Sequence, residues 1–251
     1  MEEASANLRE AVELFIESAD ASEVDGRLRG ELVNPDKWEW YKFKGSPPAL
    51  KYARRDLPTL DRALALTKGR TACVQAGGSL GIFPKYLSAH FQAVYTFEPS
   101  LDQFPLLCAN APEPNILKYQ AALGNGGPPI STSQTRREGK EHRFPHEGIT
   151  HVTSEPGAVP VLCVDDLRLP VCDLIVLDLE GYELQAILGA KGTITRCRPV
   201  LMVEINDNAA HYGYTDEQLR SLIVAMGYRQ VERIHSDELF VPTEARLHAN
   251  G

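Results

Sequence analysis

The sequence predicts a three-layer α/β protein in which a mostly parallel, doubly wound sheet is covered by helices on both faces. Three observations lead to this prediction. From residue 71 onward, short apolar segments alternate with helical patterns, which is typical of right-handed βαβ units. The segment 174–177 has four consecutive apolar residues, as expected for a strand buried on both faces. Glycines or carboxylates follow several expected strands directly, and such sheets bind ligands at that edge.

The first half of the expected sheet is regular. Its elements in chain order are strand 71–76, helix 80–90, strand 93–98, helix 100–109 and strand 116–121. The strand pattern resumes at residues 174–178 and 200–205. Together, these segments account for the alternation of strands and helices.

Residues 1–70 are expected to form a helical and aromatic lead-in packed on the core, and residues 71–251 the main domain. Residues 4–19 carry apolar side chains at helical spacing, which predicts an amphipathic helix against the body or a protein partner. An aromatic cluster follows at residues 34–41, and a second helix is expected at 57–67. For the aromatic cluster, packing is favoured over substrate stacking.

Two segments of the second half carry distinct local signals. Residues 124–160 are rich in Gly, Pro, Ser and Thr, so they are expected to cross the functional edge of the sheet as a hairpin or a loop. Thr215 and Gln218 form a capping box for a helix that ends at Gly227. A terminal hairpin should then join strands 228–234 and 238–241.

The composition narrows the classes of function. The 251 residues carry a formal charge of -8, which argues against a broad surface for nucleic acid. Because no apolar stretch reaches the ~20 residues of a membrane span, we expect a cytoplasmic protein without a membrane segment. The five cysteines lack a C-x-x-C spacing and are expected to be small buried thiols. Solvated side chains are expected for His142, His146 and His151.

The strand ends at residues 76 and 98 suggest a nucleoside site. Glycines at 77, 78 and 81 follow a strand and open a helix, so the backbone can approach a ligand and direct amide groups toward it. Glu98 ends the next strand, where a carboxylate can accept hydrogen bonds from ribose hydroxyls. A solvated acid at the strand end is the alternative. A dinucleotide fingerprint fails because position 76 is alanine, which disfavours an oxidoreductase.

Several motifs together resemble the FkbM-type family of S-adenosylmethionine-dependent methyltransferases. The resemblance covers residues 71–241, and Asp178-Leu-Glu-Gly-x-Glu183 is its most specific part. The other motifs are Gln75-x-Gly-x-Ser-x-Gly81, Phe97-Glu-Pro99, Val164-Asp-Asp-Leu167, Gly189-Ala190 and Arg198-Pro-Val-Leu-Met-Val-Glu204. The resemblance implies a Rossmann-like methyltransferase fold with seven strands, the last of them antiparallel. It also implies methyl transfer to a hydroxyl of a sugar or small metabolite.

The resemblance further implies which residues bind the cofactor. The glycine loop would line its methionine and ribose end, Glu98 would hold the ribose, and Ala121 with Ala122 would lie near the adenine. The full expected set is Gln75, Gly77, Gly78, Ser79, Gly81, Phe97, Glu98, Pro99, Ala121, Ala122 and Asp178.

This chain departs from the family pattern at two positions of the glycine loop. The family usually has an acid and an asparagine where this chain has Gln75 and Ser79. Gln75 can form hydrogen bonds but supplies no negative charge toward the cofactor's ammonium and sulfonium, a loss of about 1 to 2 kcal/mol in binding. The alternative function is therefore a catalytically silent structural or interaction subunit that docks through residues 4–19.

For the chemistry itself, Asp178 is the first candidate for general base or acceptor anchor, with Glu180 and Glu204 in support. His211 is another possible base. Asp178, Glu204 and Asn206 are hard oxygen donors that could instead bind a divalent ion, although chemistry without a metal is favoured. A purely structural interpretation is also open, in which Asp178 and Glu180 complement the N-terminus of the following helix.

Overall fold

The structure, a computed structural model, describes residues 49–135 and 149–243. The expected helix at 4–19, the aromatic cluster at 34–41, and His142 and His146 lie outside the described residues. The proposed division into residues 1–70 and 71–251 therefore stays a prediction.

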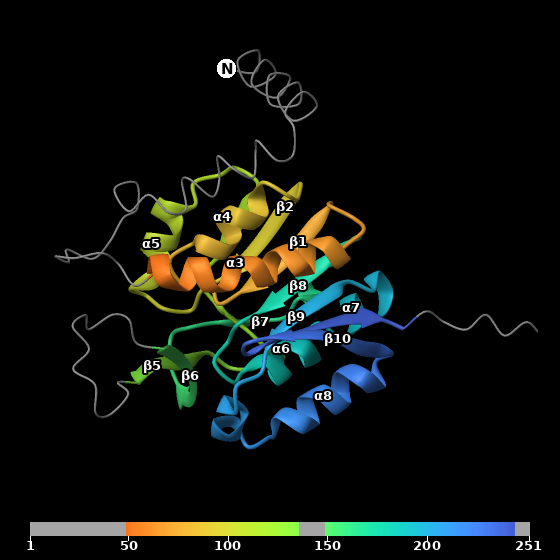
Figure 1. Ribbon diagram of the computed structural model, residues 1–251. Coiled ribbons are helices and arrows are strands. Elements are labelled where there is room, and N and C mark those ends of the chain that lie inside the picture. The colour runs from red at the N-terminus through yellow and green to blue at the C-terminus, as the bar shows by residue number, and fades with distance from the viewer. Residues whose placement is uncertain (1–48, 136–148, 244–251) are drawn as a thin grey trace, which may run out of the picture.

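The central sheet has the predicted architecture (Figure 1). Its strands are β1 (Ala72–Ala76), β2 (Ala93–Phe97), β3 (Ile116–Tyr119), β8 (Leu174–Leu177), β9 (Val200–Glu204), β10 (Tyr228–Ile234) and β11 (Asp237–Pro242). They form one seven-stranded sheet in the order β10-β11-β9-β8-β1-β2-β3. The pairings from β3 to β9 are parallel, whereas β11 is antiparallel to both β9 and β10. The expected antiparallel last strand is thus confirmed.

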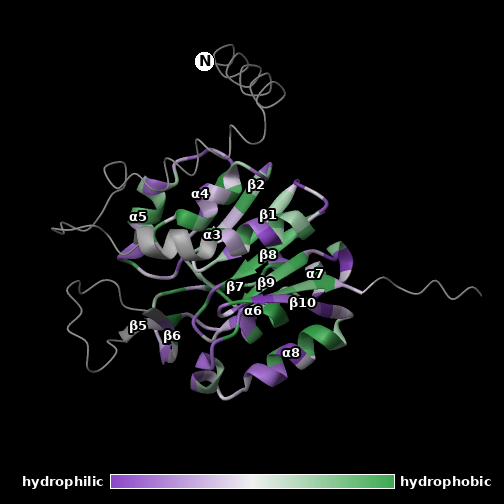
Figure 2. Cartoon of the chain, in the orientation of Figure 1, coloured by the Kyte–Doolittle hydropathy of each residue, from purple (hydrophilic) through white to green (hydrophobic). Residues whose placement is uncertain are grey.

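Helices cover both faces of this sheet, so the molecule has three layers (Figure 1). One face packs against α3 (Ala49–Leu66) and α4 (Ile82–Ser88), with α5 (Gln103–Asn110) beside α4. The other face packs against α6 (Glu183–Gly189), α7 (Lys191–Cys197) and α8 (Asp216–Ala225). Strands β8 and β9 are hydrophobic along most of their length, and edge strand β10 is hydrophilic (Figure 2). The core thus lies on both sides of the central strands.

Of two local predictions, the capping box is confirmed and the start of one helix is wrong. The capping box of α8 is confirmed: the amide of Gln218 donates to Oγ1 of Thr215 at 3.2 Å, and the amide of Thr215 donates to Oε1 of Gln218 at 2.8 Å. Helix α3 begins eight residues earlier than expected at Ala49 and contains Pro58 in its interior. Proline normally marks a helix boundary, which is why the sequence pattern placed the start too late.

The excursion at 124–160 contains a hairpin rather than only a loop. Strands β5 (Ile130–Thr135) and β6 (Ile149–Pro156) pair antiparallel, and β4 (Ala122–Leu123) pairs parallel with β7 (Val161–Leu162). The hydroxyl of Tyr212, in the 3-10 helix η3 (Asn208–Tyr212), donates to the carbonyl of Val152 at 2.9 Å. This bond ties β6 to the edge of the sheet where the loops after β8 and β9 lie.

The expectations drawn from composition hold in part. Cys73 and Cys172 are buried as expected, but Cys163 and Cys197 are only partly buried and Cys108 is exposed on α5. Cys108 lies on the solvent side of a short helix, which an apolar residue type does not reveal. Among the described residues, no helix combines the length and the apolar character that a membrane span requires.

Candidate active site

The ends of β8, β1 and β2 bring the predicted residues to one edge of the sheet. The glycine loop after β1 lies between the two acidic strand ends. A Cβ atom on Gly77 would lie 2.0 Å from the carbonyl oxygen of Asp178, after β8. A Cβ atom on Gly78 would lie 3.4 Å from Cβ of Glu98, after β2. Glu98 and Asp178 therefore flank the same short loop, as the parallel order of the strands predicts.

The glycines of this loop serve close packing. Gly77 has a φ of 84° and Gly81 a φ of 90°, which are readily adopted by glycine alone. The amides of Gly77 and Gly78 both donate to the carbonyl of Phe97, at 3.1 and 2.9 Å. The expectation that these two amides point toward a ligand is thus wrong, because the end of β2 already accepts their hydrogen bonds.

Glu98 is buried, with 3% of its surface exposed. Its Oε2 accepts a hydrogen bond from the amide of Ser79 at 2.7 Å, and its Oε1 accepts one from the amide of Ser100 at 2.8 Å. Burial raises the pKa of Glu98 to about 7, although both amide bonds act in the opposite direction. Each carboxylate oxygen keeps a second lone pair, so the group retains acceptor capacity for ribose hydroxyls.

Gln75 has no exposed surface and points into the protein. Its Nε2 donates to the carbonyl of Gly77 at 2.9 Å, and its Oε1 accepts from the hydroxyl of Thr96 at 2.5 Å. The carboxamide therefore joins the glycine loop to strand β2. A charged group that faced a ligand would point out of the protein, whereas the Gln75 side chain points inward.

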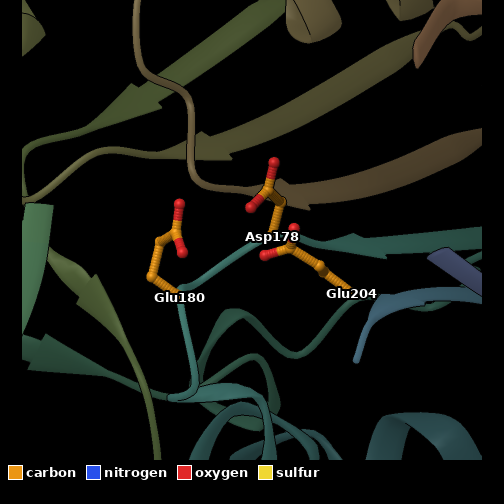
Figure 3. A group of neighbouring side chains, drawn as sticks. All are labelled: Asp178, Glu180 and Glu204. Atoms are coloured by element: carbon orange, nitrogen blue, oxygen red, sulfur yellow. The ribbon is translucent and has the colours of Figure 1, made fainter. Parts of the chain in front are cut away.

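Asp178, Glu180 and Glu204 form a compact acidic cluster (Figure 3). One carboxylate oxygen of each lies within 4.8 Å of the others, and all three side chains are partly buried. Oε2 of Glu180 accepts from Nδ2 of Asn208 at 2.8 Å, and Oε1 of Glu204 accepts from the hydroxyl of Ser236 at 3.1 Å. Burial raises the pKa of Glu204 to about 7, and the charge of Glu180 adds to this shift. The cluster can therefore hold a proton near neutral pH.

The loop after β8 owes its shape to Glu183, a motif residue that the sequence analysis left without a role. The carboxylate of Glu183 accepts from the amides of Leu179 at 2.8 Å and Gly181 at 3.3 Å. Between these amides, Glu180 adopts a left-handed φ of 54°. Burial raises the pKa of Glu183 to about 8. An acid two residues beyond a motif glycine is a local signal for this role.

Two further candidates are His211, a possible base, and Asn206, a possible metal ligand. His211 lies in η3 and is exposed. Oδ1 of Asn206 accepts from the amide of Asn208 at 3.2 Å, so this oxygen is engaged in a local turn.

His151 was expected to be solvated, and this expectation is wrong. It is partly buried on β6, hydrogen-bonds the backbone of Glu180, and its ring centroid lies 5.7 Å from that of His211. Burial lowers the pKa of His151. The hairpin delivers this side chain to the acidic edge, a contact between segments far apart in the sequence.

Four residues expected to bind the cofactor, two of them near the adenine, contribute mainly to the core. Phe97 is buried and stacks on Tyr119 with 4.8 Å between ring centroids. Ala121 and Ala122 are also buried, where β3 gives way to β4, and Pro99 is buried beside Glu98. Their contact with a cofactor stays a prediction.

Other motif residues hold elements together. Asp165 lies in the 3-10 helix η2 (Asp165–Leu167), and its carboxylate accepts from the amides of Gly192 at 2.8 Å and Thr193 at 2.7 Å, at the start of α7. A Cβ atom on Gly189 would lie 1.8 Å from the carbonyl oxygen of Gly124. These positions need their residue types for packing and capping.

The order of strands, with β11 antiparallel between β9 and β10, defines the Rossmann-like fold of S-adenosylmethionine-dependent methyltransferases. The family model described as "Methyltransferase FkbM domain" matches residues 84–230, more than half of the chain. This chain belongs to the FkbM methyltransferase family. The matched range begins after the glycine loop.

Three solved methyltransferase structures are similar to this chain. Methyltransferase FkbM from Methylobacillus flagellatus KT is 15% identical with a TM-score of 0.43, over 87% of this chain and 58% of that one. NodS, an N-methyltransferase from Bradyrhizobium japonicum WM9 in complex with S-adenosyl-L-homocysteine, is 14% identical with a TM-score of 0.42, over 87% and 96%. Magnesium protoporphyrin IX methyltransferase from Synechocystis PCC 6803 with bound SAM is 13% identical with a TM-score of 0.44, over 90% and 99%. No curated protein matches the chain.

Proposed function

We propose that this protein transfers a methyl group from S-adenosylmethionine to a hydroxyl of a sugar or another small molecule. The observation that carries the proposal is the convergence of Glu98, the glycine loop and the acidic cluster at one edge of the sheet. Membership of the FkbM family supports the reaction type. The acceptor class is the one that the resemblance to the FkbM-type family implies, and the polar, acidic character of this edge is compatible with it.

The chain's own residues fit an adenosyl cofactor at the ends of β1 and β2. Glu98 would accept hydrogen bonds from the ribose, and the segment 77–81 would line the methionine end. Ala121 and Ala122 would lie near the adenine, and Phe97 and Pro99 would complete the cofactor site. When bound, the cofactor supplies an electrophilic methyl group on a sulfonium.

The acidic cluster would bind the acceptor hydroxyl and remove its proton. Holding the acceptor oxygen near the methyl group can supply about 7 to 11 kcal/mol of the acceleration. Asp178 is our candidate base, because it follows β8 directly and touches the glycine loop through its backbone. Glu180 and Glu204 would share the proton, since three carboxylates this close titrate together. His211 remains a second candidate base.

A divalent ion is the less favoured way to use the same edge. Oxygen ligands from Asp178, Glu204 and Asn206 would suit magnesium, and Glu180 adds a further carboxylate to the cluster. Burial already gives Glu204 a pKa of about 7, so the cluster can accept a proton without a metal. For that reason we favour chemistry without one.

The second candidate function is that of a silent methyltransferase fold within an assembly. The observation that favours it is the state of Glu98, whose two oxygens already accept hydrogen bonds from the protein's own backbone. If these two bonds hold the carboxylate turned away from a ribose, its remaining lone pairs stay unused, and the chain serves as a structural subunit.

Isothermal calorimetry on the full chain separates the two functions. We expect wild-type protein to bind S-adenosylhomocysteine at micromolar concentration. The Glu98→Gln variant should bind about 10- to 100-fold more weakly, since a charge-assisted hydrogen bond contributes about 1.5 to 3 kcal/mol. Glu155→Gln, a change of an exposed acid, is the matched control. Absence of binding by the wild type would favour the silent fold.

A further inference from the structure

We propose that Gln75 is a positioning residue for the cofactor loop, and that its carboxamide holds the loop in shape where related chains carry an acid. The proposal rests on the proposed function, because the loop matters only if it binds the cofactor. It replaces the sequence-based expectation that loss of the charge at this position weakens the site.

The register of the sheet gives the buried side chain of Gln75 a polar partner. Gln75 on β1 lies directly opposite Thr96 on β2, and both side chains have no exposed surface. The Thr96 hydroxyl donates to Oε1 of Gln75 at 2.5 Å. Since the oxygen accepts this bond, the nitrogen Nε2 is left to donate, and it donates to the carbonyl of Gly77 at 2.9 Å.

Gly77 is the residue that most constrains the loop. Its amide donates to Phe97 at 3.1 Å, its carbonyl accepts from Gln75, and its Cα packs against the carbonyl of Asp178. Its left-handed φ of 84° turns the chain out of β1. Gln75 therefore adds a side-chain contact that links this turn to the buried interior of the sheet.

A carboxylate at position 75 does not fit this arrangement. It would place a negative oxygen against the carbonyl oxygen of Gly77, where the present side chain offers an N–H donor. A protonated carboxyl group would reproduce the pattern, because its O–H can donate to Gly77 while its other oxygen accepts from Thr96. In a fully buried position, the acid favours this neutral form.

The Gln75→Glu variant of the full chain tests this inference. Its binding is measured by calorimetry with S-adenosylhomocysteine as the probe. We expect affinity within about twofold of wild type near pH 5.5, where a buried carboxyl is protonated. Above its raised pKa, the affinity relative to wild type should fall by up to about tenfold for each pH unit. Comparison with wild type at every pH removes the titration of Glu98.

Gln92→Glu is the control variant, because Gln92 is exposed and the change in charge is the same. Its affinity ratio to wild type should stay constant with pH. Thermal unfolding without ligand is the second readout for both variants. Gln75→Glu should lose stability relative to wild type as the pH rises through the raised pKa, and Gln92→Glu should not.

Three results would overturn the inference. The ratio of affinities for Gln75→Glu stays flat from about pH 5.5 to about pH 9, the range in which a raised carboxyl pKa would fall. Binding becomes tighter at high pH, as expected for a charge that attracts the cofactor directly. Unfolding of this variant follows that of Gln92→Glu. Wild-type protein that binds no probe at any pH would instead contradict the proposed function, and the unfolding data would then decide alone whether Gln75 holds the loop.

Discussion

Gly77 and Asp178 are packed so closely that a Cβ atom on Gly77 would lie 2.0 Å from the carbonyl oxygen of Asp178. The glycine loop and the acidic edge are therefore one structural unit. A change that shifts the backbone of either one is expected to disturb both cofactor binding and the position of Asp178, the candidate base.

The Gly77→Ala variant tests this coupling. It combines a strained left-handed φ with a backbone clash, so we expect a loss of about 3 kcal/mol in unfolding free energy and loss of S-adenosylhomocysteine binding. Gly213→Ala is the matched control: its φ is 77° but nothing lies within 4 Å of the added Cβ, and it should lose about 1 kcal/mol. Equal effects in denaturant titrations would argue against a tight loop at Gly77.

Asp178→Asn tests the assignment of the base. The amide keeps the size of the side chain but cannot accept a proton, so turnover should fall about 100-fold or more, while binding of S-adenosylhomocysteine stays within about twofold. Methyl transfer from labelled S-adenosylmethionine to a panel of methyl glycosides and polyols is the measurement. A variant with unchanged turnover would exclude Asp178 as the base and direct attention to His211.

Metal removal tests the preferred chemistry of the acidic cluster. We expect methyl transfer to survive dialysis against EDTA, because Glu204 can carry a proton near neutral pH. The assay is turnover before and after dialysis, with and without added magnesium. Activity that disappears with EDTA and returns with magnesium, and that Glu204→Gln removes, would establish a metal site at Asp178 and its neighbours.

The sequence was sufficient to place Glu98 and Asp178 on one edge of the sheet. Both follow buried apolar segments, and parallel strands present their carboxyl ends on the same side. The capping box at Thr215 was equally accessible, because all of its partners lie within four residues. Patterns of this local kind fix where strands and helices end.

The direction of buried polar side chains was beyond sequence reasoning. The inward orientation of Gln75 depends on the register with Thr96 across two strands. The position of His151 depends on a bond between Tyr212 and Val152, which are 60 residues apart. These contacts follow from how segments pack in space, and neither spacing nor residue type encodes them. Glu183 is the exception, since an acid close to the turn it caps could have been recognised.

The dependence of stability on pH gives a final prediction that needs neither cofactor nor acceptor. Burial raises the pKa of Glu98 and Glu204 to about 7 and that of Glu183 to about 8. In the unfolded chain these carboxyls titrate near 4.5. Between about pH 4.5 and about pH 8, the native state binds more protons than the unfolded state. The free energy of unfolding must therefore fall as the pH rises through this range.

We therefore expect the contribution of these three carboxyl groups to the stability of the cofactor-free protein to be largest near pH 4.5. This contribution should be lost steadily up to about pH 8. Glu183→Gln removes the group with the highest pKa and should flatten the slope between about pH 5 and pH 8. Glu217→Gln is the control, because the Glu217 side chain is 78% exposed and its removal should leave the slope unchanged. Urea titrations at several pH values measure the slope. Two outcomes would contradict the prediction: a stability that rises with pH over this range, or a slope that Glu183→Gln leaves as steep as before. Either would mean that Glu183 is ionised in the native state and held by the amides of Leu179 and Gly181.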